Sequence, residues 1–444
     1  MAGIIQQVLA DAKSESSKQR KRYIEKLIDY YSGTDTWRYI GSYFDADSFN
    51  EIPVYDINVT KKFIDKKSRV YTLSPTREID NSKNKTDQYS KLTRKKDLKM
   101  KHIERITNLV GVPALRVLWD EDEDGNFFDY NCIYYYDAIF DESNPYDPVA
   151  IVYPILAPTN DVTYLEKSKY AYWDAEVYMV FDEDGNVEYE EDNPYGVLPF
   201  VFPRSTVQID DFYGEGASDI VSVNEHINIA MTELMLGLRF QMFGQPWASG
   251  VYQDSPLARM GTDMIINLPE GGAFGIETPG GNLGQVIEVI KFKLELLAMS
   301  QHMYVTFESN QDRPSSGLAL KIKDFEHVQD YKDDLELWRD FEKKLYNLEK
   351  IIATSNNTNL GSSLIVDFKE PEYPVSVQEQ ITKDNWDLDN GLITLEEIYK
   401  RDRSDISIEE ARAIIEKNKG EQDAEEVESQ EAGEEEKKAG FKAV

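Results

Sequence analysis

Three long segments of helical periodicity constrain the fold of this chain more than any other feature. They cover residues 218–243, 282–303 and 317–355, and a stretch rich in glycine and proline, 246–281, separates the first two. At ~1.5 Å per residue, the first helix would be roughly 39 Å long and the third roughly 57 Å long. The sequence therefore predicts an elongated subunit in which two long helices flank a small module of turns and short strands.

The second of these helices is predicted to be apolar on two sides. One side consists of Leu283, Val286, Ile287, Ile290, Leu294 and Leu297, and the other of Val289, Phe292, Leu296 and Met299. A narrow polar stripe lies between them and consists of Glu288, Lys291, Glu295 and His302. A helix that is apolar on more than one side needs more than one neighbour. The polar stripe itself could also be an ordinary solvated face.

Residues 112–203 change period and predict a sheet-rich region. Apolar and aromatic residues crowd on either side of Asp124-Gly125, and the same device returns at Asp184-Gly185. Both dipeptides are typical of tight hairpin turns. A single late strand is expected at 363–371. Together with the helical segments, these strands predict the α+β class.

The two ends of the chain are predicted to be helical. Residues 1–32 favour one helix with a basic patch, Lys18 to Arg22, on its exposed side. Near the other end, Thr394 with Glu397 and Ser407 with Glu410 match the capping box that opens a helix, and Asn282 with Gln285 resembles it. Residues 421–436 hold acidic but no basic side chains, which is typical of a disordered tail.

Charge is distributed unevenly along the chain. The net charge is −33, yet residues 1–105 hold 22 Lys and Arg against 15 Asp and Glu, so the remainder is far more acidic. A chain of this kind repels nucleic acid over most of its surface. The basic segment Lys83 to Lys101 is interpreted as a solvated helix face, with contact to an acidic protein or to DNA phosphates as the alternative.

The sequence indicates neither a membrane span nor a disulfide framework. Cys132 is the single cysteine, and no apolar run approaches the ~18 residues of a membrane helix. The start lacks the basic and apolar regions of a secretory signal. We therefore expect a cytoplasmic, reducing setting.

No catalytic constellation or cofactor motif stands out, so the expectation is a protein that is not an enzyme and has no cofactor or metal. Asp120 to Gly125 resembles the start of a calcium loop, but the twelfth position is Asn131 instead of glutamate, which favours a plain hairpin tip. The glycine-rich strings lack the lysine of a phosphate-binding loop. Two other classes stay open: a hydrolase that uses carboxylates of 112–203, and a cation-binding adhesin.

The order of these parts and several strings resemble the portal proteins of tailed bacteriophages, in particular the siphophage-type portals. The resemblance covers most of 110–420. The similar strings are NPYGVLPFVFPRST from 193, YGEGASDIVSVNEHINIAMTELM from 213, PSSGLALKIKDFE from 314 and LDNGLITLEEIYKRD from 388. Another phage head–tail connector component is the alternative within the same class.

The resemblance implies a division of the chain into the parts of a portal subunit. Residues 1–215 would form a wing, 216–245 the first stem helix, 246–281 the clip, 282–303 the second stem helix, 304–316 a tunnel loop, 317–375 a long helix and a strand that returns to the wing sheet, 376–420 a small helical crown, and 421–444 an acidic disordered tail.

The resemblance also implies partners and a place of action. Such subunits form a ring, expected to be a dodecamer, at one vertex of the virion capsid after assembly in the host cytoplasm. Double-stranded DNA passes through the ring, which contacts the large terminase subunit, a head–tail adaptor, and the major capsid and scaffold proteins.

Three sets of residues follow from this layout. The tunnel loop would present Asn310, Gln311, Asp312, Arg313, Pro314 and Ser315. The channel-facing stem would present Glu288, Lys291, Glu295 and His302. Partners would dock on the clip through Tyr252, Leu257, Arg259, Met260 and Phe274.

Overall fold

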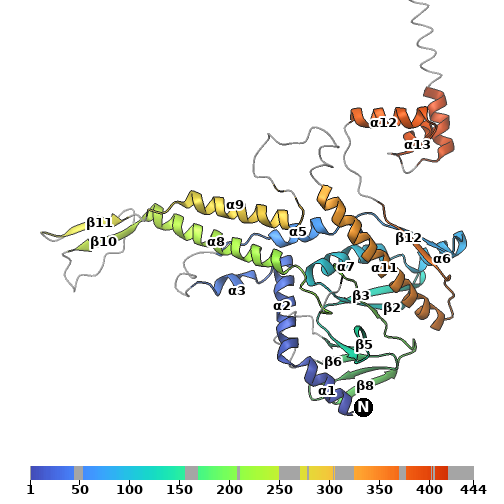
Figure 1. Ribbon diagram of the computed structural model, residues 1–444, viewed down its shortest axis with the longest axis horizontal. Coiled ribbons are helices and arrows are strands. Elements are labelled where there is room, and N and C mark those ends of the chain that lie inside the picture. Colours follow the sequence, from blue (N-terminus) through green and yellow to red (C-terminus); the bar gives the residue numbers. More distant parts are fainter. Residues whose placement is uncertain are drawn as a thin grey trace, which may run out of the picture. The chain divides into compact units, whose positions relative to one another are not determined.

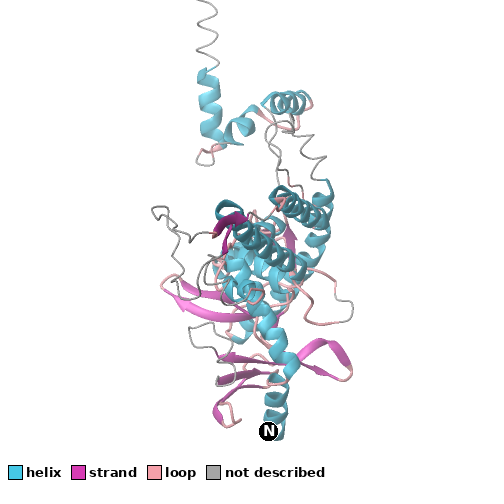
Figure 2. Ribbon diagram, turned by 90° about the vertical axis from the view of Figure 1, so that its left-hand side faces the viewer, coloured by secondary structure: helices cyan, strands magenta, loops and turns pink. Residues whose placement is uncertain are grey.

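The computed structural model describes residues 2–44, 54–155, 169–207, 211–249, 271–277, 280–303, 305, 325–369, 377–401, 403 and 406–418. These residues form a mixed α+β protein, as the sequence predicts (Figure 2). The chain divides into two compact units: Met1–Gln311 with Lys323–Pro371, and Asp312–Ile322 with Glu372–Val444. Of the helices that the structure describes, none combines the length and the apolar content needed to cross a membrane.

Two antiparallel sheets occupy the sheet-rich region of the first unit. The smaller has the order β3-β2-β9, from Gly125–Ile133, Ala114–Asp122 and Phe200–Val201. The larger has the order β4-β5-β6-β7-β8, from Asp137–Asp141, Asn144–Ile155, Lys169–Trp173, Val177–Phe181 and Val187–Asp192.

Both predicted hairpins are present in these sheets. Asp122 pairs with Gly125 across a two-residue turn between β2 and β3, and β7 pairs with β8 around the second turn signal. Gly125 and Gly185 have φ values of 97° and 86°, which explains why glycine follows aspartate at each turn.

The N-terminal segment forms two helices where the sequence predicts one. Helix α1 spans Ala2–Ala12 and α2 spans Glu15–Ser32. Ser14 between them is extended, and its side chain accepts a hydrogen bond from the Ser17 backbone N–H, so it caps a new helix. Helix α1 packs on the five-stranded sheet through Ile5, Val8 and Leu9.

The basic patch of α2 is only partly on the surface, contrary to the prediction. Lys21 is buried, and its Nζ lies 2.5 Å from Asp137 Oδ2. Arg20 pairs with the same carboxylate, and its guanidinium lies 3.7 Å from the centre of the Tyr213 ring. The patch therefore fastens α2 to β4.

The apolar periodicity of residues 86–111, with Leu92, Leu98 and Ile103 on one side, predicts a single helix that ends at Gly111, but this region also divides into two helices. Helix α6 spans Lys83–Leu92 and α7 spans Lys96–Val110. Leu98, which the periodicity assigns to the apolar side, is 81% exposed. The break near Thr93 rotates the second helix and places Met100 in the core instead.

The late strand β12, Leu364–Asp367, pairs with β1, Thr76–Ile79, in a two-stranded antiparallel sheet. The late strand thus pairs with a strand inside residues 1–215 that lies outside the sheet-rich region 112–203. Strand β1 was missed because Pro75 marks a break immediately before it. Asp80 fixes this pairing by accepting hydrogen bonds from the backbone N–H groups of Ser362 and Ser363.

Helices α8, Ser218–Phe243, and α9, Leu283–Ser300, lie side by side and form a helical hairpin (Figure 1). The two-stranded sheet of β10, Gln245–Ser249, and β11, Ala273–Glu277, lies at its far end. Short helices α3, Thr36–Gly41, and α5, Val59–Lys67, contact α8.

Helix α11, Phe325–Ser355, packs across the three-stranded sheet. Trp338, Phe341 and Leu345 are buried in the core that it shares with α7, β2 and β3. The predicted start of this helix, 317–324, lies outside the described residues.

The second unit contains α12, Val377–Asp389, α13, Leu395–Arg401, and a further helix over 408–418. The two capping boxes are confirmed, since the side chains of Thr394 and Glu397, and of Ser407 and Glu410, exchange hydrogen bonds with each other's backbone N–H groups. Both terminal guanidinium nitrogens of Arg401 donate hydrogen bonds to the carboxylate of Asp384 in α12. The predicted disordered tail, 421–444, lies outside the residues described.

Candidate assembly surface and the junction at its base

The helical hairpin is held together by one buried face of each helix. Ile227 and Leu234 of α8 and Ile290 and Leu297 of α9 are each at most 8% exposed. Ile290 and Leu297 belong to the first apolar side that the periodicity predicts for α9. A Cβ added to Gly237 would lie 3.2 Å from the Leu283 side chain, so this glycine allows the helices to approach closely.

The second predicted apolar side of α9 faces solvent in the single subunit. Val289 is 52% exposed, Phe292 59%, Leu296 48% and Met299 70%. Their spacing of three or four residues places them in one stripe along the helix. We call these four residues the α9 stripe. Contiguous exposed apolar side chains of this kind mark an interaction surface.

The polar residues Glu288, Lys291 and Glu295 run beside the α9 stripe. At 3.6 residues per turn they lie between the exposed apolar stripe and the buried face of the same helix. Lys291 Nζ lies 3.2 Å from Glu288 Oε1, one turn away. Because Lys291 neutralises only one of the two glutamates, the three polar residues together keep a net negative charge. Asn282 makes no side-chain cap here, so the third capping box is wrong.

His302 does not continue this polar stripe. It lies beyond Ser300, the last residue of α9, has a φ of 50°, and its Nδ1 lies 2.7 Å from Asp330 Oδ2 of α11. The periodicity places it on the stripe only because a regular helix is assumed to run to residue 303.

Helix α8 exposes a second apolar stripe toward the far end of the hairpin. Met235 is 38% exposed, Leu238 37% and Met242 75%, at a spacing of three and four residues. We call these three residues the α8 stripe. On the two-stranded sheet beyond it, Trp247 and Ile276 are also about half exposed.

Of the predicted docking residues on this sheet and its loop, Phe274 is described. It lies in β11, is half-buried, and pairs with Ala248 of β10. Tyr252, Leu257, Arg259 and Met260 lie outside the described residues. The same is true of the predicted tunnel-loop residues Asn310, Gln311, Asp312, Arg313, Pro314 and Ser315.

One face of α8 is polar and holds residues 55–60, which comprise the stretch before α5 and the start of α5, a contact that the sequence reasoning missed. Asn224 Oδ1 accepts hydrogen bonds from the backbone N–H groups of Val59 and Thr60, at 2.6 and 2.8 Å. Asn228 Oδ1 and Thr232 Oγ1 do the same for Ile57 and Tyr55, at 3.0 and 3.1 Å. The spacing of Asn224, Asn228 and Thr232 by four residues is the signal that could have revealed this face.

The base of the hairpin is fixed by glycines that allow two chain segments to cross. Gly216, just before α8, has a φ of 58°, and a Cβ there would lie 2.3 Å from the Leu109 carbonyl oxygen at the end of α7. Gly111 has a φ of 93°, and a Cβ there would lie 2.8 Å from the Tyr213 carbonyl oxygen. Side chains at these positions would separate α7 from the start of α8.

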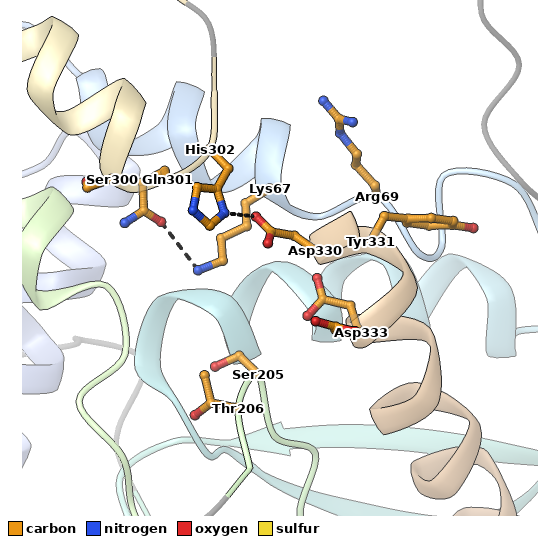
Figure 3. A pocket seen from close by; sticks show the side chains of 11 residues that line it. Lys67, Arg69, Ser205, Thr206, Ser300, Gln301, His302, Asp330, Tyr331 and Asp333 are labelled. Carbon is orange, nitrogen blue, oxygen red and sulfur yellow. Dashed lines mark hydrogen bonds and ion pairs between the residues drawn. The ribbon is translucent and has the colours of Figure 1, made fainter. Parts of the chain in front are cut away.

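A cavity of about 250 Å³ lies where α5, α9 and α11 meet (Figure 3). The residues that line it all carry polar groups: Lys67, Arg69, Ser205, Thr206, Ser300, Gln301, His302, Asp330, Tyr331, Asp333 and Asp334. Besides the His302–Asp330 pair, Lys67 Nζ lies 3.4 Å from Gln301 Oε1. Gln301 Nε2 in turn donates to Asp219 at the start of α8, at 2.6 Å. The hydrogen bonds around the cavity thus connect the end of the hairpin to α11.

Helix α11 is fastened to the body by a buried network of charges. Lys96 Nζ lies 3.0 Å from Glu342 and 3.0 Å from Glu349, and Arg77 lies 2.7 Å from Glu342. Lys96, Glu342 and Glu349 are fully buried. Burial opposes ionisation of Glu342, but Lys96 and Arg77 outweigh it and lower the pKa of this carboxyl.

Three tyrosine hydroxyls complete this network. Tyr71 donates to Glu342, and Tyr89 and Tyr130 donate to Glu349. The interpretation of Lys83 to Lys101 as a solvated face is therefore wrong at Lys96, which points inward. Burial and the neighbouring carboxylates raise the pKa of all three tyrosines well above 10, so they stay donors.

An aspartate of the hairpin tip that resembles a calcium loop forms ion pairs with basic side chains of the same chain. Asp122 pairs with Arg94, and its other oxygen lies 3.2 Å from Lys95 Nζ. Within the described ranges, no three His, Cys, Asp or Glu side chains are grouped as a metal site requires. These pairs fit the interpretation of 120–125 as a hairpin tip.

No protein-family model matches this chain, and no curated protein matches it either.

Proposed function

We propose that the chain is the subunit of a portal ring of a tailed bacteriophage, through which DNA enters and leaves the capsid. The observation that carries the proposal is the pair of exposed apolar stripes on the α8–α9 hairpin. A folded subunit that leaves these side chains in water is incomplete without a partner.

The placement of the stripes favours a head-to-tail contact between copies. The α9 stripe and the α8 stripe lie on different helices, so the α9 stripe of one copy would pack on the α8 stripe of the next. A heterologous contact of this kind produces a closed ring or an open filament. In a closed ring, every copy buries both of its stripes through one type of contact.

The magnitude of this contact indicates that it needs support from elsewhere in the subunit. Burying the exposed part of one such side chain contributes on the order of 1 kcal/mol. Seven side chains per contact then give roughly 7 kcal/mol, which is similar to the ~4–15 kcal/mol cost of association. The wing must therefore add contacts, or many copies must close together.

The acidic stripe beside the apolar one suits a DNA conduit. Lysine and arginine contacts with phosphates hold DNA in place, whereas Glu288 and Glu295 repeated around a ring repel it. Lys291 would soften this repulsion locally. In this proposal the β10–β11 end docks the terminase and later a head–tail adaptor, and the ring sits in the virion with capsid and scaffold proteins around it.

The proposal is tested by the size of the purified protein and of two matched variants. We expect wild type to form rings in electron microscopy and mass photometry. Leu296→Asp places a charge in the α9 stripe and should give folded monomers, whereas Leu98→Asp, at an exposed leucine outside the stripe, should leave rings intact. Wild type that stays a 51.1 kDa monomer at micromolar concentration would contradict the proposal.

A further inference from the structure

The α9 stripe and the α8 stripe lie at different heights along the hairpin. Near its base, Gln301 Nε2 donates to Asp219, and farther out a Cβ on Gly237 would lie 3.2 Å from the Leu283 side chain. Because the two helices run antiparallel with the same rise per residue, the α9 stripe is level with roughly residues 221–231 of α8. The α8 stripe begins beyond this part of the helix, toward the far end of the hairpin. The α9 stripe of one copy therefore lies closer to the base than the α8 stripe that it would meet.

At the height of the α9 stripe, α3 and the stretch before α5 cover the side of α8 on which the α8 stripe lies. Asn228, Thr232 and Met235 follow one another at spacings of four and three residues, so the polar face of α8 continues into the α8 stripe. Asn228 Nδ2 donates to Asp56 Oδ1 at 3.1 Å, and Asp56 also accepts a hydrogen bond from the Thr36 hydroxyl in α3. Helix α3 is thereby fastened over this side of α8.

The α9 stripe and α3 lie on opposite sides of the hairpin. At about 100° per residue, the α9 stripe is centred roughly half a turn away from Ile290 and Leu297, the side chains that α9 buries in the hairpin. Figure 1 shows α3 beside α8, on the side away from α9. A second copy that approached the α9 stripe with the opposite side of its own hairpin would therefore present α3.

The two covering segments expose large apolar side chains. Trp37 of α3 is 53% exposed, Tyr43 just after this helix 60%, and Ile57 in the stretch before α5 37%. We call these three residues the α3 surface. The side chains of the two stripes only about balance the cost of association, so the proposed ring needs contacts from residues 1–215 as well. The α3 surface belongs to that part of the chain and extends the exposed apolar side of α8 toward the base.

We propose that the α3 surface of one copy receives Phe292 and Leu296, the middle of the α9 stripe, of the next copy. This inference rests on the proposed ring and adds to it a second contact between the same two copies. Copies of a ring are related by rotation about one axis, so each contact joins surfaces at similar heights. Phe292 is level with Asn228 and Leu296 with Asn224, the two asparagines to which the Ile57 backbone is hydrogen-bonded. The α8 stripe then meets the outer end of the α9 stripe.

Disulfide cross-linking in the full chain tests this contact. Ile57→Cys with Phe292→Cys should give a ladder of covalent multimers when assembled rings are oxidised. Leu98→Cys with Phe292→Cys is the matched control, because this exposed leucine lies outside the α3 surface, and it should give no ladder. The single variants, which also keep the one native cysteine, Cys132, should give none either. Adding Leu296→Asp to the first pair should leave monomers without covalent multimers, because the bond joins two copies.

A charge at Trp37 provides a second readout. Trp37→Asp should raise the protein concentration at which half of the copies are in rings by roughly tenfold, because a charge then replaces a buried aromatic side chain. Trp386→Asp, at a similarly exposed tryptophan of the second unit, should leave this concentration unchanged. In the monomeric Leu296→Asp background, Trp37→Asp should not change the melting temperature, which separates a lost contact from a folding defect.

The outcomes separate this contact from the proposed ring itself. Rings that give no ladder with the cysteines at Ile57 and Phe292, and that assemble at the same concentration with Trp37→Asp, would overturn the contact and leave the ring standing. Wild type that forms no rings would overturn both.

Discussion

Helices α9 and α11 are both long and amphipathic, yet they differ in how much of their apolar surface is buried within the subunit. Helix α11 buries aromatic side chains and even two charged ones, Glu342 and Glu349, inside its own subunit. Helix α9 buries Ile290 and Leu297 and leaves the α9 stripe in water. The difference is that α11 is packed within the subunit, whereas the hairpin leaves apolar side chains exposed, as the proposed ring contact requires.

Among the variants that test this difference, the largest loss of unfolding free energy should come from breaking the charge network of α11. Lys96→Met leaves Glu349 without a cation, and we expect a loss of about 3–5 kcal/mol in unfolding free energy. Denaturant unfolding of a monomeric background such as Leu296→Asp would measure it.

Two further variants sharpen this result. Lys96→Met with Glu349→Gln should recover part of the loss, because the unpaired charge is removed. Lys95→Met, at the partly exposed pair with Asp122, should cost less than about 1 kcal/mol. Equal losses for Lys95 and Lys96 would show that burial of the network is not what holds α11.

A smaller effect is expected where α8 holds residues 55–60, which include the start of α5. Asn224→Ala leaves the buried backbone N–H groups of Val59 and Thr60 without an acceptor, at a cost of about 1–3 kcal/mol. Limited proteolysis should then cleave this segment faster. Ser222→Ala, at an exposed position of the same helix, is the control. If the cleavage rate does not change, the segment is held by other contacts.

The smallest effect on stability should come from the acidic stripe of α9. Glu288→Lys with Glu295→Lys changes exposed side chains, so melting should shift little. If the stripe faces DNA, the variant rings should bind DNA at low salt and release it as salt rises. Unchanged DNA binding, with rings intact, would make the stripe an ordinary solvated face.

Much of the fold could be predicted from patterns within one segment. Periodicity located α8 and the two apolar sides of α9, and turn dipeptides located both hairpins. Prediction failed where distant segments decide. Strand β1 exists because β12 pairs with it, and Lys96 points inward because Glu342 and Glu349, far along the chain, meet it there.

The candidate site divides in the same way. The sequence marked the α9 stripe by its spacing, but not whether a neighbouring segment of the same subunit covers it. His302 was assigned to the polar stripe because regular helix geometry was extended past Ser300. The α8 polar face was missed because its partner is a backbone segment, which leaves no complementary side-chain pattern.

The sequence by itself determined the long helices, both hairpins and two of the three capping boxes, because their hydrogen bonds close within a few residues. Only the tertiary structure decided which amphipathic faces are buried and which charges are paired, because burial depends on segments that lie far apart in the chain. That is why the tertiary structure could distinguish helix α11, whose apolar and charged faces are buried, from the hairpin, whose apolar stripes are exposed.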